Sequence, residues 1–167
     1  LNRTLKMAVK YCDGKVPSVE VQDIPVTLSV VELAQTAGQD VAEAYCNLQL
    51  SSACGIALGL ARAGNKFIDE QAPWSQFKAG NLVQVNQTLY AILEIVRLAA
   101  YLLAPVVPTL STKIYQQLGY TIHFNQIESL SQTIPFEIHS RWGALPPGQN
   151  FGHPEPIFQK ILTPELV

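Results

Sequence analysis

The sequence predicts an all-α fold, an antiparallel bundle of four to five helices followed by an extended, proline-rich C-terminal tail. Apolar residues recur at helical spacing through most of residues 1–120. The most hydrophobic segment, residues 89–107, is apolar nearly all round, as expected of the central helix of a bundle. The helical period is lost beyond residue 120, and residues 142–158 contain four of the eleven prolines, so this part cannot be helix.

Composition limits the domain organisation and the classes of function. The chain has 167 residues, 48% of them hydrophobic, which is enough for one domain with a sizeable core. We assign the helical bundle to residues 1–120 and an irregular C-terminal segment to residues 121–167. The net charge is −2, so any nucleic-acid contact must come from a local cluster of cations. Three cysteines without a CxxC spacing favour reduced thiols over disulfides or zinc ligands.

Residues 1–12 are expected to form a helix with an apolar face and a basic face. The apolar stripe consists of Leu5, Ala8, Val9 and Cys12. Arg3, Lys6 and Lys10 share the other face, which is either solvated or a basic edge for phosphates or bases. No capping residue precedes this helix, so we expect the chain to be part of a longer protein.

Two further helices are expected over residues 28–50 and 51–72, with a break near Asn47. The apolar face of the first consists of Val31, Ala34, Val41, Ala44, Tyr45 and Leu48. That of the second runs through Ile56, Leu58, Leu60, Phe67 and Ile68. The second helix is also rich in alanine and glycine, which allow the close approach of a neighbouring helix.

The long apolar segment that ends at residue 107 is a bundle helix and not a membrane span. Glu94 and Arg97 lie within it, and a charge at the centre of a spanning helix costs about 2.5–3.5 kcal/mol. At i and i+3 the two side chains can form a local pair. Leu93, Val96 and Ala100 are expected to face the core. A short helix over residues 109–118 follows.

Residues 63–74, AGNKFIDEQAPW, are the most informative stretch of the chain. Pro73 ends the helix, and Trp74 follows directly in a short polar link over residues 74–80. Arg62 and Lys66 are four residues apart and share one side of the helix. Trp74 is therefore either a plug in the core or a platform on which an unstacked RNA base lies.

The sequence contains no motif for catalysis or metal binding. There is no glycine-rich phosphate loop, no histidine pair at metal-ligand spacing and no nucleophile with a nearby base. His123, His139 and His153 lie in the irregular region without a cysteine or acidic partner at ligand spacing. We therefore predict no catalytic residue, no metal site and no cofactor in this chain.

Several motifs, taken in chain order, resemble the C-terminal anticodon-binding domain of methionyl-tRNA synthetase, a class I aminoacyl-tRNA synthetase. Residues 65–74, NKFIDEQAPW, are similar to the family signature Asn-x-x-Ile/Val-Asp-x-x-x-Pro-Trp. LNRTL at residues 1–5 resembles the start of the first bundle helix, and APVVP at residues 104–108 resembles a buried Pro-x-x-Pro helix end. Residues 142–158 resemble the linker that closes many members.

The resemblance implies recognition of the anticodon of the methionine tRNA, CAU. Trp74 would stack on an unpaired anticodon base, and Arg3 would bind a base edge or a phosphate. The family's companion asparagine, four residues before the arginine, falls before Leu1. The residues with supporting roles would be Asn65, Lys66, Asp69 and Pro73. Asn65 and Asp69 would hydrogen-bond neighbouring helix ends and hold the loop that carries Trp74. Lys66 would contact a phosphate.

The resemblance also implies partners outside the chain. The family's catalytic domain uses ATP with Mg²⁺ to ligate methionine to tRNA. The ATP-binding motifs of that domain are absent from this sequence. We therefore expect no methionine-dependent exchange between ATP and pyrophosphate from this chain alone. The expected partners are the anticodon loop and the catalytic domain, against which residues 121–167 would pack if they do not pack on the bundle. We expect no membrane contact and a cytoplasmic location, or an organellar one in a eukaryote.

A helical protein–protein interaction module without RNA binding is the alternative. Such a module would use an exposed apolar patch and not Trp74 and Arg3. Salt distinguishes the two, because RNA binding weakens steeply as salt is added.

Overall fold

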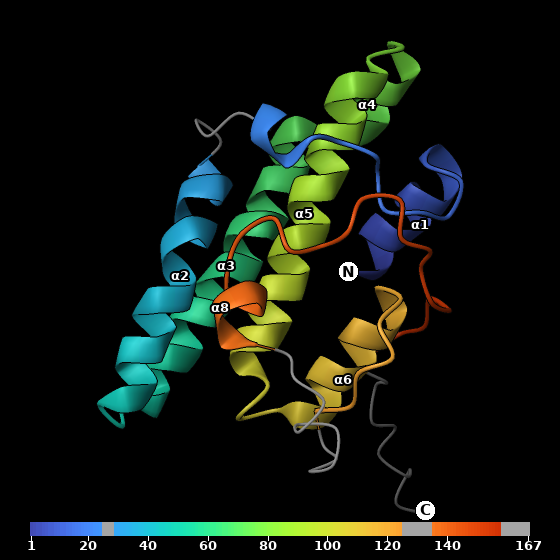
Figure 1. Cartoon of the computed structure of the whole chain (residues 1–167). Helices are drawn as coiled ribbons and strands as arrows, with labels where there is room; N and C mark the ends of the chain where they lie inside the picture. Colours follow the sequence, from blue (N-terminus) through green and yellow to red (C-terminus); the bar gives the residue numbers. More distant parts are fainter. Residues whose placement is uncertain (25–28, 125–134, 158–167) are drawn as a thin grey trace, which may run out of the picture.

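The computed structural model describes residues 1–24, 29–124 and 135–157, and these residues form a helical bundle (Figure 1). Apart from one bridge between Lys15 and Asn150, their regular structure is helical. The helices are α1 (Asn2–Tyr11), the 3₁₀ turn η1 (Val21–Asp23), α2 (Ser29–Cys46), α3 (Leu50–Gln71), α4 (Pro73–Lys78), α5 (Leu82–Leu103), α6 (Pro108–Gln117) and α8 (Phe136–His139). The predicted all-α bundle is confirmed.

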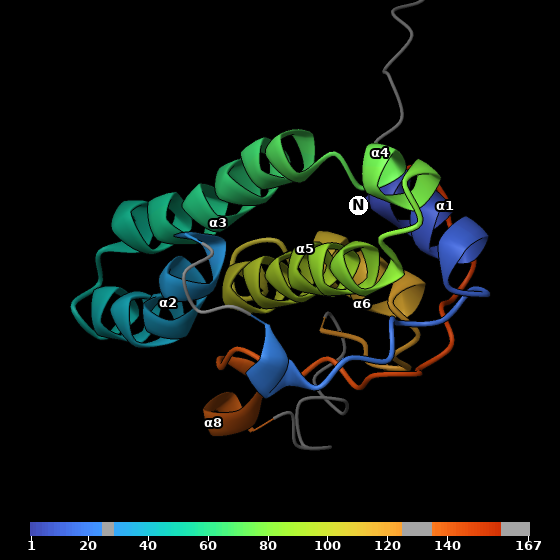
Figure 2. The same ribbon diagram turned by 90° about the horizontal axis from the view of Figure 1, so that it is seen from above.

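Helix α5 is the centre of the bundle. Helices α2 and α3 lie on one side of it and α1, α4 and α6 on the other, and α3 runs antiparallel to both α2 and α5 (Figures 1 and 2). Because it has neighbours on several sides, α5 buries residues around most of its circumference. Leu93 and Ala100 are buried as predicted, whereas Val96 is only half-buried. In the part of the chain that the structure describes, no helix combines the length and apolarity needed to span a membrane.

Three predicted core residues are exposed. Leu48 is 85% exposed because α2 has already ended at Cys46 and Leu48 lies in the turn, with a positive φ of 58°. This turn confirms the predicted break near Asn47. Val9 and Leu58 are 46% and 43% exposed, because α1 and α3 lie at the outside of the bundle and bury narrower faces than we expected.

Residues 74–80 were predicted as a link, and this prediction is wrong for most of them, because Pro73 begins helix α4. Ala72 adopts a left-handed conformation, with φ 42° and ψ 60°, and this ends α3. Proline at the first helical position costs no hydrogen bond, because the N–H groups there have no partner within the helix. Trp74 therefore lies in the first turn of a second helix and not beyond a helix end.

The described C-terminal segment, residues 135–157, contacts α2 and α5. The short helix α8 lies in a region that we expected to be irregular. It comes so close to α2 that a Cβ at Gly38 would clash with the carbonyl oxygen of Ser140, so glycine is required there. The division of the chain at residue 120 stays a prediction, since residues 125–134 and 158–167 are outside the described ranges.

Glu94 accepts the hydrogen bonds that hold the C-terminal segment on α5. Its carboxylate forms a two-point pair with Arg97, with 2.7 Å from Nε to Oε2 and 2.7 Å from Nη2 to Oε1, and both side chains are fully buried. The backbone N–H groups of Gly143, Ala144 and Leu145 also donate to it, at 2.7, 2.9 and 3.1 Å. The predicted local pair is confirmed, and its carboxylate has five donors.

Arg97 donates the remaining hydrogen bonds of this cluster. Its guanidinium donates to the carbonyl oxygens of His139 and Arg141, both at 2.7 Å, and to the hydroxyl of Tyr115 at 3.3 Å. Buried charges are tolerated when they are paired and fully hydrogen-bonded. The C-terminal segment supplies most of the partners that the two charges of α5 need.

We predict that Arg97→Met lowers the free energy of unfolding by about 3–5 kcal/mol, because it leaves the Glu94 carboxylate buried without its counter-charge. Urea denaturation measures the change. Arg62→Met, at an exposed arginine of α3, is the matched control and should change stability little. An Arg97→Met variant within 1 kcal/mol of the parent would show that the pair does not hold this segment.

Stability should also fall in mild acid because of His139. Burial, together with the nearby charge of Arg97, lowers the pKa of this imidazole from 6.5 to about 4. As the pH falls from 6.5 towards 4, the unfolded chain takes up a proton that the folded chain does not bind, so stability decreases through this window. His139→Asn should show a smaller decrease between pH 6.5 and 4 in urea titrations, whereas His153→Asn, at an exposed residue, should follow the parent.

Candidate nucleic-acid interface

Three helices bring Arg3, Asp69 and Trp74 together. Arg3 is in the first turn of α1, Asp69 in the last turn of α3 and Trp74 in the first turn of α4. The Nη2 atom of Arg3 donates a hydrogen bond to Oδ1 of Asp69 at 2.9 Å. The central carbon of the same guanidinium lies 5.7 Å from the centre of the Trp74 ring, within the range of a cation–π contact. Arg3 thus contacts both other residues.

Local sequence patterns place these side chains at the surface. In α1 the neighbours Thr4 and Leu5 are buried, which leaves Arg3 on the outer side of the helix. In α3 Phe67 and Ile68 are buried, which leaves Asp69 outside. The Arg3 and Asp69 side chains keep 56% and 65% of their surface exposed, so solvent and a ligand can reach both.

Trp74 is half-buried and packs against the main core cluster. It is therefore neither a fully buried plug nor a freely projecting side chain. Pro73 beside it is buried and anchors the start of α4. Core packing fixes the orientation of the indole, while its exposed part stays open to a ligand.

The other predicted residues lie further along α3. Asn65 is exposed and lines, together with Leu1 and Arg3, a cavity of about 250 Å³ between α1, α3, α5 and α6. Lys66 forms an exposed ion pair with Glu70 at 3.5 Å. The carboxylate of Asp69, which we predicted to bond a neighbouring helix end, binds the side chain of Arg3 in the first turn of α1, and its supporting role stays a prediction.

A second aromatic group, absent from our sequence predictions, lies between α1 and α4. The rings of Tyr11 and Phe77 stack with centroids 4.0 Å apart and planes 15° from parallel. Nζ of Lys10 lies 5.7 Å from the Tyr11 ring centre. The spacing of Trp74 and Phe77, three residues apart, was visible in the sequence, but it carries meaning only if residues 73–78 are helical.

Neutralising partners are unevenly distributed over these cations. Arg3 and Lys66 each pair with a carboxylate. Among the described residues, no carboxylate lies within 4.0 Å of Lys6 or Lys10, and both are exposed. The outer face of α1 therefore offers unpaired positive charge to an anion.

The described residues offer no metal site, and the thiol of Cys12 is not activated. They contain no group of three or more histidine, cysteine or acidic side chains placed to hold a metal ion. Cys12, Cys46 and Cys54 are free thiols. Burial, and then the charge of Asp13, raises the pKa of Cys12 to about 11, so this thiol stays neutral and unreactive near pH 7.

Comparison with known families gives a match along most of the chain. Residues 39–166 match the family model described as the anticodon binding domain of methionyl tRNA ligase. A methionine–tRNA ligase of Thermosynechococcus vestitus is 49% identical over 167 residues, which are 100% of this chain and 31% of that protein. The chloroplastic/mitochondrial methionine–tRNA ligase of Arabidopsis thaliana is 37% identical over 171 residues, 99% of this chain and 26% of that protein.

A solved structure has a similar arrangement of helices. Mycobacterium tuberculosis methionyl-tRNA synthetase in complex with methionyl-adenylate aligns with a TM-score of 0.71 and 26% identity. The alignment covers 94% of this chain and 29% of the other. The chain thus spans about three-tenths of the length of the relatives that it matches.

We predict that Asp69→Asn changes the free energy of unfolding by less than about 1 kcal/mol, because ion pairs between exposed side chains contribute about 0–1 kcal/mol. Thermal or urea denaturation measures the change. Glu70→Gln, which removes the exposed partner of Lys66, is the matched control. A loss above about 2 kcal/mol for Asp69→Asn alone would show that the contact with Arg3 fastens α1 to α3 and is mainly structural.

Proposed function

Since the chain belongs to the family of anticodon-binding domains of methionyl-tRNA ligases, we propose that it binds the anticodon loop of the methionine tRNA, with the sequence CAU. The observation that carries the proposal is the contact of the Arg3 guanidinium with the half-exposed Trp74 ring. Proteins hold unstacked RNA bases by combining aromatic faces with neighbouring cations. Here both groups lie on helices that the core fixes.

In this proposal Trp74 stacks on one splayed anticodon base. Arg3 donates hydrogen bonds to a base edge or a phosphate. A guanidinium has five N–H donors, and the contact with Asp69 uses one of them, so Arg3 can engage RNA while Asp69 still orients it. Asn65, on the cavity wall beside Arg3, and Lys66, exposed on α3, would supply further polar groups.

We propose that the chain acts as part of a longer methionine–tRNA ligase. The M. tuberculosis synthetase binds methionyl-adenylate, which accords with the use of ATP in a catalytic domain of the same protein. We propose that this ATP is used with Mg²⁺. This chain would supply tRNA recognition to that domain. The Arabidopsis relative is chloroplastic/mitochondrial, and for this chain we propose the cytoplasm or an organelle.

A protein-interaction module is the alternative that the test must exclude. Leu48 and Leu50 are 85% and 57% exposed at the turn between α2 and α3, and such residues could contact another protein. This turn is far from α4 (Figure 1), so binding through it would not depend on Trp74.

The deciding experiment titrates the chain with a CAU anticodon stem-loop and with a stem-loop of another anticodon. Trp74→Ala should weaken binding of the CAU loop by about 1–3 kcal/mol, the range for one base–aromatic stack, and Trp74→Phe should retain part of the binding. Fluorescence anisotropy measures affinity, and circular dichroism confirms the fold.

Trp142→Ala removes a half-buried tryptophan from the C-terminal segment and is the matched control. It should bind the CAU loop as the parent does. Equal affinity of the parent for the two stem-loops, or a folded Trp74→Ala variant that binds as tightly as the parent, would contradict the proposal.

A further inference from the structure

Helices α1 and α4 carry a second aromatic and basic group beyond Arg3 and Trp74. We propose that Lys10, Tyr11 and Phe77 form a second contact point for the same RNA strand. It would hold one loop nucleotide outside the anticodon triplet, with its base against the Phe77–Tyr11 stack and its phosphate near Lys10. This inference rests on the proposed function.

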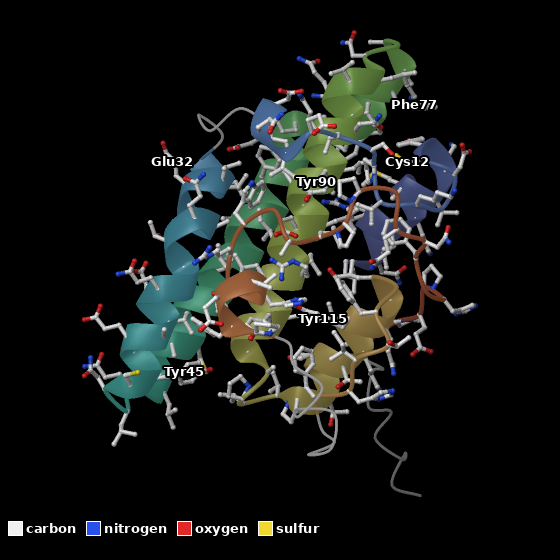
Figure 3. All side chains as sticks on the ribbon, in the orientation of Figure 1. Cys12, Glu32, Tyr45, Phe77, Tyr90 and Tyr115 are labelled. Carbon is white, nitrogen blue, oxygen red and sulfur yellow. The ribbon has the colours of Figure 1, made fainter. Side chains whose placement is uncertain are left out.

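The two groups belong to one surface because each joins a side chain of α1 to a side chain of α4. Trp74 and Phe77 are three residues apart and project from one side of α4. Each meets a residue of α1: Trp74 meets Arg3, and Phe77 meets Tyr11. Figure 3 shows Phe77 at the α4 end of the molecule, on the side of α1. Arg3 and Tyr11 are about 12 Å apart along the axis of α1, so a strand held at one group can reach the other.

The geometry of the second group suits base stacking. The Tyr11 and Phe77 rings are nearly parallel at 4.0 Å, and both are only half-buried. A base can extend such a stack, since every base has a π-face. Stacking tolerates every base and Lys10 would meet a phosphate, so this contact should hold a nucleotide with little selection of its base.

The charge of α1 supports the same reading. Lys6 and Lys10 are exposed without a carboxylate partner among the described residues, and Lys78 is exposed in the last turn of α4. The whole chain has a net charge of −2, so these cations are a local feature and not part of a basic molecule. Cations in this arrangement attract phosphates through counterion release.

The test compares Lys10→Gln and Phe77→Leu with the parent in anisotropy titrations over a salt series, using both stem-loops. Lys10→Gln should weaken the two loops by the same factor and reduce the slope of log affinity against log salt by about 1. Phe77→Leu should weaken both about fivefold or more, as expected for loss of one base stack. An abasic nucleotide at one loop position outside the triplet should remove the effect of Phe77→Leu.

The matched controls are Lys113→Gln on α6 and Phe136→Leu on α8, which change exposed residues elsewhere on the bundle. Both should bind as the parent does. If Lys10→Gln leaves the affinity and the salt slope unchanged, the inference is wrong, and the Tyr11–Phe77 stack only fastens α4 to α1. This result holds even if Phe77→Leu fails to fold.

The two proposals fail in different ways. A parent that does not prefer the CAU loop, or a folded Trp74→Ala variant with full affinity, overturns the proposed function. A parent that prefers CAU and depends on Trp74, with Lys10→Gln indistinguishable from Lys113→Gln, overturns only the second contact point.

Discussion

The buried pair of Glu94 and Arg97 is the constraint on which the rest of the molecule depends. Two full charges at the centre of the most apolar helix are stable only if every donor and acceptor has a partner. The segment around residues 139–145 provides backbone groups to both side chains, and this fixes it on α5. The segment continues to Gly148 and Gln149, which form backbone hydrogen bonds with Val16 at 2.9 and 2.8 Å. These bonds hold the residues that follow α1 in place. The charges of α5 thereby support the helix that carries Arg3.

The candidate interface combines groups from parts of the chain that differ in how firmly they are held. The positions of Trp74 and Phe77 are fixed by the start of α4, where Pro73 is buried. The position of the Arg3 backbone is fixed by the burial of Thr4 and Leu5, while the Arg3 guanidinium stays exposed beside Asp69. Exposed ion pairs contribute little to stability, so in the proposed function Arg3 would exchange or share its partner with an RNA phosphate at small cost. A rigid platform with an adjustable cation would then hold the splayed bases.

Local patterns were sufficient for most of the helices and misleading at their edges. The break near Asn47 and the short helix after Pro108 follow from turn and proline signals, and the structure has both. The prediction of a link over residues 74–80 is wrong because a proline that ends one helix can also begin the next. A short polar sequence after the proline does not show whether a second helix follows. Val9 and Leu58 fit apolar stripes, but the width of a buried face depends on how many neighbours the helix has.

The sequence by itself determined the helical class, the central place of the long apolar helix, the Glu94–Arg97 pairing at i and i+3, and the signature of residues 65–74. All of these depend on residues within a few turns of one another. Only the tertiary structure decided that Arg3 meets Asp69 and Trp74, that Tyr11 stacks on Phe77, and that Glu94 holds backbone groups 49 to 51 positions away. These contacts depend on how helices cross and how loops return, and helical periodicity contains no information about the distance or angle between two helices.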